Sequence, residues 1–290
     1  QIPSDGNLKS NKKLGHKLIN FVIGDKNIDL IKPVAIFKLN NDSLLILDQG
    51  NQNIFLYSKK SDELNYFLQS DSEIVPSVIG SWRDDQNKIL FTDSKLNKVF
   101  EYNCIKNEFT ELNDQLIFQQ PTGIAHSSVT NETWIVQTHL HQISIIEDNG
   151  NLKYVFGERG SEPGRFNFPT YIWIDESGTI YIIDSLNFRV QIFSKDGELI
   201  SVFGEQGNAS GYFARPKGIA TDTYGNIYIV DALFHTVQIF DKKGNFLYNF
   251  GNQGRGKGEF QIPSDGNLKS NKKLGHKLIN FVIGDKNIDL

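Results

Sequence analysis

The sequence is poor in cysteine and has no methionine. Cys104 is the single cysteine among 290 residues, so an intrachain disulfide, a cysteine-based zinc knuckle and an iron–sulfur cluster are all excluded. Because methionine is absent and Gln1 is the first residue, we expect a processed chain or an excerpt of a longer one. A hydrophobic content of 39% supplies the side chains for a large core, which excludes a disordered chain.

Long apolar runs and an excess of basic residues are also missing. Asp, Asn, Lys or Gly interrupts every apolar run well before the roughly 20 residues that a membrane-spanning helix requires. The 30 Lys and Arg residues are outnumbered by 34 Asp and Glu residues, whereas nucleic-acid-binding proteins usually carry a basic surface. We therefore expect no membrane span and no nucleic-acid partner. The lysine-rich stretch at residues 7–17 is expected to be a linker.

The sequence repeats itself with a period of about 47 residues. Residues 167–213 align with residues 214–260 without a gap. A proline recurs at one position of the unit, at intervals of 43 to 48 residues, and marks five complete units. These prolines are Pro33, Pro76, Pro121, Pro169, Pro216 and Pro263.

Each unit alternates short apolar runs with turn sequences such as Asp-Gly and Tyr-Gly-Asn. This pattern is typical of antiparallel strands joined by hairpins. In the clearest unit we predict four strands and no helix, with the strands at residues 171–175, 179–184, 189–194 and 199–204. Four strands in about 40 to 50 residues is the spacing of a β-propeller blade. The sequence therefore predicts an all-β propeller built from four-stranded antiparallel blades.

Three segments between units share the motif Phe-Gly-x-x-Gly, with a second Phe ten residues after the first. They are residues 156–166, 203–213 and 250–260. With the following Gly-x-Ile-Tyr-Ile-x-Asp and Val-Gln-Ile-Phe strands, the units resemble the NHL repeat over about four-fifths of the chain. The resemblance implies a six-bladed propeller, of which five blades are clear and the sixth is incomplete or closed by a terminal strand. Its bacterial members further imply an extracytoplasmic location (periplasmic, cell-surface or secreted) and, as one partner, a multihaem cytochrome.

The last 30 residues, 261–290, are identical to residues 1–30. Such identity indicates a recent duplication, an engineered overlap, or a polymer unit of 260 residues read past its end. We assign residues 1–30 to a linker and closing strand, residues 31–260 to five blades, and residues 261–290 to a partial sixth blade or an exchanged segment. One copy would close the ring and hide two sheet edges, so the other leaves exchange between chains open.

An acceptor side chain recurs where the second predicted strand of each unit ends. A residue that recurs in every blade generally serves the blade, and Asp at a strand end caps a turn by accepting N–H bonds. We therefore interpret these residues as structural turn residues, against the alternative of a ring of carboxylates that binds a cation. They are Asp48, Asp93, Asp184 and Asp231, with Gln137 at the equivalent place in the third unit.

Three histidines of the third unit are candidate metal ligands, namely His126, His139 and His141. A spacing of two residues would place His139 and His141 on one face of a strand, where both could bind one metal ion. The peptidyl-hydroxyglycine amidating lyases resemble NHL propellers and bind zinc through histidines, which implies a metal-dependent lyase as one alternative. That family draws its histidines from separate blades, and only His235 offers a ligand outside the third unit. The expected cofactor is therefore none.

Two predicted loops carry candidate partner-binding residues, Phe188 and Arg189 in one and Phe234 and His235 in the other. Aromatic and arginine side chains are enriched at the energetic centres of protein interfaces. Packing between blades is the competing interpretation for both loops.

Recognisable catalytic sequence motifs are lacking. The Gly-rich segments have neither the lysine nor the strand-to-helix context of a phosphate-binding loop, and no Gly-x-Ser-x-Gly occurs. We therefore expect a non-enzymatic propeller that binds a protein or other macromolecule, or copies of itself, through one loop face. The alternatives are a subunit of a fibre or array joined through the duplicated segment, and the metal-dependent lyase.

Overall fold

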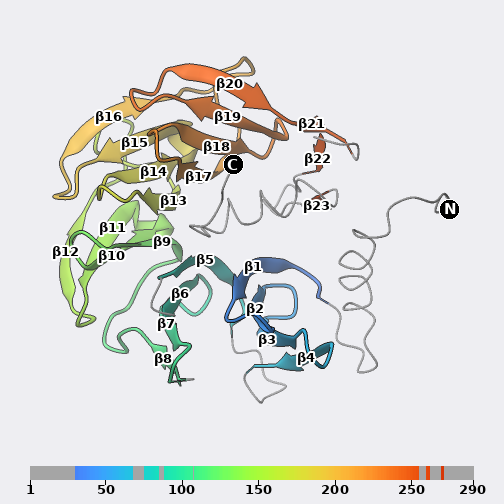
Figure 1. Ribbon diagram of the computed structural model, residues 1–290. Helices are drawn as coiled ribbons and strands as arrows, with labels where there is room; N and C mark the ends of the chain where they lie inside the picture. The colour runs from blue at the N-terminus through green and yellow to red at the C-terminus, as the bar shows by residue number, and fades with distance from the viewer. Residues whose placement is uncertain are drawn as a thin grey trace, which may run out of the picture. The chain divides into compact units, whose positions relative to one another are not determined.

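The computed structural model shows five four-stranded antiparallel sheets, each with its strands in sequence order (Figure 1). The residues that the structure describes are 30–67, 75–84, 88–106, 108–254, 259–261 and 269–270. The chain divides into two compact units, residues 1–76 and residues 77–290. The first unit holds one of these four-stranded sheets and the second holds the other four, so the predicted all-β propeller of four-stranded blades is confirmed.

Each sheet is one blade, and we number the blades along the chain. Blade 1 is β1 (Pro33–Lys38), β2 (Ser43–Asp48), β3 (Asn53–Ser58) and β4 (Glu63–Tyr66). Blade 2 is β5 (Val78–Arg83), β6 (Lys88–Asp93), β7 (Lys98–Asn103) and β8 (Glu108–Glu111). Blade 3 is β9 (Pro121–Ser127), β10 (Glu132–Gln137), β11 (Gln142–Glu147) and β12 (Leu152–Phe156). Blade 4 is β13 (Pro169–Ile174), β14 (Ile180–Asp184), β15 (Arg189–Phe193) and β16 (Leu199–Phe203). Blade 5 is β17 (Pro216–Thr221), β18 (Ile227–Asp231), β19 (Thr236–Phe240) and β20 (Phe246–Phe250).

Two single-turn 3₁₀ helices correct the expectation of a chain without helices. They are η1 (Thr138–Leu140) and η2 (Ser185–Asn187), and each fills the loop between the second and third strand of its blade. Each turn is closed by a residue in the left-handed region, His141 with φ of 58° and Phe188 with φ of 54°. Among the described residues, no helix has the length and apolar character needed to cross a membrane.

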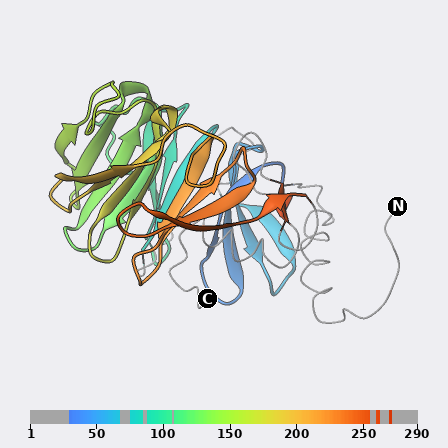
Figure 2. The ribbon, with the colours of Figure 1, turned by 90° about the horizontal axis from the view of Figure 1, so that it is seen from above.

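The second strand of each blade lies at the centre of the core. All six residues of β10 and all five of β14 are buried, although a strand with one face in water would alternate. In the second unit one apolar cluster joins blades 3 and 4 and another joins blades 4 and 5. The first strands of successive blades, β5, β9, β13 and β17, contact one another, and the fourth strands lie on the outside (Figure 1). Figure 2 shows the strands of blade 3 side by side in one sheet.

The link between blades explains the Phe-Gly-x-x-Gly motif. Phe213 is fully buried, and Gln206 pairs with it in an isolated parallel bridge, as Arg159 does with Phe166 one blade earlier. Gly204 has a φ of +94°, and a Cβ placed on it would lie 2.3 Å from the Phe213 ring. The motif is therefore a backbone turn into which only glycine fits, closed by a buried aromatic ring.

The duplicated segments lie almost entirely outside the described residues, and so do the linker at residues 7–17 and the proposed closing strand. The described part of the C-terminal copy consists of Gln261, at the end of β22 (Glu259–Gln261), and β23 (Lys269–Ser270). β22 pairs in parallel with β21 (Asn252–Gln253), at the position of the parallel bridges of the earlier links, and antiparallel with β23.

Replacement of Gly204 by alanine tests this account of the link. Gly204→Ala forces a Cβ into the Phe213 ring and a non-glycine residue into a left-handed conformation. We expect the free energy of unfolding to fall by about 3 kcal/mol, from backbone strain and overpacking together. Urea unfolding monitored by tryptophan fluorescence measures the change.

Gly164→Ala is the matched control, because Gly164 has a φ of +83° and an added Cβ there would meet no heavy atom within 4 Å. Its free energy of unfolding should fall by only about 1–2 kcal/mol, from backbone strain alone. Equal losses in the two variants would show that the aromatic ring does not require glycine.

Candidate functional site

The loops between the second and third strands, and the links that enter each blade, meet at the same end of the blade. This follows from the antiparallel order, because the first strand starts where the second strand ends. In the second unit this end comprises the four loops 94–97, 138–141, 185–188 and 232–235, together with the link residues before β9, β13 and β17. We call it the loop face, and it carries most of the residues singled out from the sequence.

The recurring acceptor at the end of the second strand holds the link to its blade. In every blade its side-chain oxygen accepts a hydrogen bond from a backbone N–H just before the first strand, and the four Asp side chains are fully buried. The donor–acceptor pairs are Ile31 to Asp48 (2.8 Å), Ser77 to Asp93 (2.8 Å), Gln119 to Gln137 (2.9 Å), Asn167 to Asp184 (2.6 Å) and Ala214 to Asp231 (2.8 Å). Each acceptor therefore fixes the place where its blade begins.

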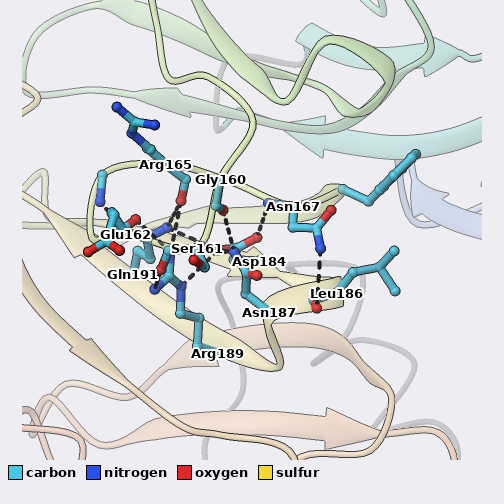
Figure 3. A network of polar contacts seen from close by, with 12 residues as sticks. Gly160, Ser161, Glu162, Arg165, Asn167, Asp184, Leu186, Asn187, Arg189 and Gln191 are labelled. Atoms are coloured by element: carbon cyan, nitrogen blue, oxygen red, sulfur yellow. Dashed lines mark hydrogen bonds and ion pairs between the residues drawn. The ribbon is translucent and has the colours of Figure 1, made fainter.

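In blade 4, side chains supply most of the donors to this acceptor, in addition to the backbone N–H of Asn167 (Figure 3). Asp184 Oδ2 accepts hydrogen bonds from Asn187 Nδ2 and Arg189 Nε, both at 2.8 Å, and from Gln191 Nε2 at 3.1 Å. Gln191 Oε1 in turn accepts from the backbone N–H of Gly164 at 2.8 Å. A buried carboxylate with this many donors is fully compensated for the loss of water.

Arg189 is a buried part of this network, so its place corrects the expectation that it faces a partner. Only 8% of Arg189 is exposed. Besides its bond to Asp184, its guanidinium donates to the carbonyl oxygens of Ser161 (2.6 Å), Glu162 (2.9 Å) and Arg165 (2.9 Å). The guanidinium of Arg189 therefore binds groups of the protein itself, namely Asp184 and the link at residues 161–165. We do not include Arg189 in a binding surface.

The structure does not bring the three candidate metal ligands together. His139 lies within η1 and His141 caps it in a left-handed conformation, so the expected shared strand face does not exist. His126 lies five residues along β9 from its start, roughly 16 Å away from the loop face, and pairs with Thr133 across the strands. Within the described part of the chain, no group of three or more His, Cys, Asp or Glu side chains is arranged to hold a metal ion.

His141 serves instead as an uncharged acceptor between the loop and the next link. Its Nδ1 accepts the backbone N–H of Phe168 at 2.9 Å, and its ring lies edge-on to the Phe168 ring at 4.6 Å. Burial lowers the pKa of His141, and the nearby Arg159 cation lowers it further. The neutral imidazole is therefore the form that fits the folded chain.

Three consecutive blades carry a pair of hydroxyl groups on the loop face that our sequence reasoning missed. One hydroxyl comes from the start of the first strand and the other from the loop residue directly after the recurring acceptor. The pairs are Ser77 with Ser94 (2.8 Å), Thr122 with Thr138 (2.7 Å) and Thr170 with Ser185 (2.5 Å). The signal was available, because Ser or Thr follows both the phase-marking proline and the acceptor in these three units.

Leucine recurs at the tips of the same loops, and this signal was also missed. The loops of blades 2 to 5 each contain one leucine at their second or third tip position, namely Leu96, Leu140, Leu186 and Leu233. In blades 4 and 5 the leucines are 51% and 61% exposed. The predicted partner-binding residues Phe188, Phe234 and His235 lie beside them and are half-buried. Phe188 packs against the apolar cluster of blades 4 and 5.

Comparison with known proteins agrees with the fold. A family model described as a 6-bladed beta-propeller matches residues 177–234. No curated protein matches the sequence of the chain. Six solved structures that it resembles are 14% to 16% identical, a level that shows the fold alone.

Three of these structures illustrate the range of functions. A streptogramin B lyase is 16% identical with a TM-score of 0.59, over 82% of this chain and 81% of that chain. The virginiamycin B lyase from Staphylococcus aureus is 16% identical with a TM-score of 0.57, over 76% and 69%. A nidogen/laminin complex contains a chain that is 16% identical with a TM-score of 0.57, over 75% and 79%.

Removal of the buried arginine tests the network of blade 4. Arg189→Met leaves the Asp184 carboxylate buried without its cation and three carbonyl groups without their donor. We expect the free energy of unfolding to fall by about 3–5 kcal/mol. Arg165→Met removes an arginine from an exposed ion pair with Glu158 and should cost less than about 1 kcal/mol. Similar losses in both variants would contradict the structural role of Arg189.

The lowered pKa of His141 predicts a pH dependence of stability. As pH falls below 6.5, the ordinary pKa of histidine, the unfolded chain takes up a proton before the folded chain does, so stability falls. His141→Asn removes this dependence, and asparagine tolerates the left-handed conformation. Urea unfolding at several pH values between 7 and 5 measures the free energy of unfolding. This free energy should fall less steeply with decreasing pH in the variant than in the wild type. Equal slopes of the free energy of unfolding against pH for His141→Asn and the wild type would refute the assignment.

Proposed function

We propose that the chain is a non-enzymatic β-propeller that binds a protein partner through the loop face of blades 4 and 5. The observation that carries the proposal is the pair of exposed leucines, Leu186 and Leu233, at the tips of equivalent loops in adjacent blades. Covering a leucine side chain is worth about 1.5–3 kcal/mol, so two such residues on one face favour an apolar partner surface.

The surroundings of the two leucines suit a binding surface. The same two loops also contain three half-buried ring side chains, Phe188, Phe234 and His235. Aromatic side chains are common at the energetic centres of protein interfaces. Asp184 accepts a hydrogen bond from Asn187 of one loop, and Asp231 accepts from the backbone N–H groups of Leu233 and Phe234 of the other, at 2.8–3.3 Å. A surface that is already ordered loses little conformational entropy when a partner binds.

The comparisons agree with a binding role as well as with catalysis, and they do not identify a partner. The fold occurs in a nidogen/laminin complex and in lyases, and propellers in general host both binding and catalysis. A lyase would need catalytic side chains in one place, and His126 lies at the other end of its blade from His139 and His141. The fibre alternative depends on the duplicated segments, which lie outside the described residues. An extracytoplasmic protein, such as the multihaem cytochrome implied by the NHL resemblance, remains the first partner to test.

The double variant Leu186→Ser/Leu233→Ser tests the proposal. Partners are captured from the organism's own periplasmic and cell-surface extract, identified by mass spectrometry and purified. Their dissociation constants are then measured by biolayer interferometry against each form of the chain. We expect the double variant to bind at least about 100-fold more weakly, because two apolar side chains are lost from the interface.

Leu199→Ser/Leu247→Ser is the matched control. These two leucines are 39% and 52% exposed in the same two blades, but on the outer strands β16 and β20. The control should keep wild-type affinity, and circular dichroism should show both variants folded. A purified partner that binds the loop-face variant as tightly as the wild type would refute the proposal.

A further inference from the structure

A polar hollow lies on the loop face of blades 2 and 3, away from the leucines of blades 4 and 5. It is open to solvent, and its volume is about 390 Å³. It is lined by the loop of blade 2, the link into blade 3 and the loop of blade 3. The lining residues are Ser94, Asn97, Gln119, Gln120 and His139.

The lining of the hollow has hydrogen-bonding capacity but no carboxylate, lysine or arginine. Hydroxyl, amide and imidazole groups each donate and accept hydrogen bonds. Gln119, Gln120 and His139 are exposed, and within the described part of the chain their side chains make no hydrogen bond. These groups are therefore available to a ligand that offers both donors and acceptors and carries no net charge.

The backbone around the hollow is fixed in a rare conformation. Asn97 and Gln120 both lie in the left-handed region, with φ of 60° and 51°, although neither is glycine. The N–H of Gln120 donates to Asn97 Oδ1 at 2.8 Å, and its carbonyl accepts from Thr138 N at 3.2 Å. The N–H of Gln119 donates to the buried Gln137 Oε1 at 2.9 Å. A left-handed residue recurs at the position of Asn97 in every blade, so this conformation belongs to the blade and holds the wall of the hollow in place.

We infer that this hollow binds a neutral saccharide. A sugar ring presents neighbouring hydroxyl groups, each a donor and an acceptor, and these match side chains that can also do both. A phosphate or carboxylate ligand would find no cation among the lining residues, and an apolar ligand would leave the amides unpaired. The inference goes beyond the proposed function and does not rest on it, because the two sites use different blades.

The test is isothermal titration calorimetry of the full chain with defined probes. The neutral probes are maltotriose, cellotriose, xylotriose, mannotriose and triacetylchitotriose, and the comparison probes are trigalacturonate and triglycine. We expect saturable binding of at least one neutral saccharide and none of the comparison probes at the same concentration. Gln119→Ala/His139→Ala should weaken that binding at least about tenfold, because two hydrogen-bonding side chains are lost.

The control variant is Gln115→Ala, an exposed glutamine of the same link that does not line the hollow. It should bind the saccharide like the wild type, and so should Leu186→Ser/Leu233→Ser, which separates this inference from the protein-binding proposal. The inference is overturned if no neutral saccharide binds, or if the double variant binds as tightly as the wild type. Binding of trigalacturonate or triglycine that is lost in the double variant would also overturn it, because the hollow would then serve another ligand class.

Discussion

The structure depends on one buried hydrogen-bond acceptor per blade, at the end of the second strand. A buried carboxylate or amide that lost its donors would cost free energy, so the link N–H groups that bind it cannot move away. This fixes where the first strand starts. Because the loop between the second and third strands leaves from the same residue, its tip is positioned at the same time. The same buried acceptor therefore fixes both the fold of each blade and the position of its loop on the loop face.

The donors that bind the buried acceptor differ from blade to blade. The residues at the loop tips can therefore differ as well. In blade 5 the Asp231 carboxylate accepts from four backbone N–H groups, so no particular neighbouring side chain is required. In blade 4 the Asp184 carboxylate accepts from one backbone N–H and three side chains, and Arg189 extends the network into the link at residues 161–165. Both solutions leave an exposed leucine at the tip. The acceptor has the same role in each blade, while the exposure of the tip leucine rises from 38% at Leu96 in blade 2 to 51% at Leu186 and 61% at Leu233 in blades 4 and 5.

Much of the fold could be predicted from the sequence, because the 47-residue period aligns strands, turns and acceptors in every unit. The predicted strands of blade 4 agree with the structure within two residues at each end. The burial of Arg189 could not be predicted, since three of its four partners are carbonyl groups of a link 24 to 28 residues earlier, and backbone carbonyls leave no signal in the sequence. His139 and His141 were placed wrongly for a related reason. A two-residue spacing implies a shared face only in extended backbone, and the chain here turns through η1.

A face made of equivalent loops lets one domain hold separate sites without linking them. The tips of blades 2 and 3 and those of blades 4 and 5 lie in different loops, and each loop is tied to its own buried acceptor. Sites without shared contacts contribute almost independently to binding, whereas coupling would require an element that both ligands shift. The link into blade 4 is the element that could transmit such a shift, because it bonds both His141 of the blade 3 loop and Asp184, and these hydrogen bonds hold it in place. A saccharide bound at the polar hollow should therefore leave the affinity of the apolar tips for a protein unchanged, so that both ligands can occupy one chain.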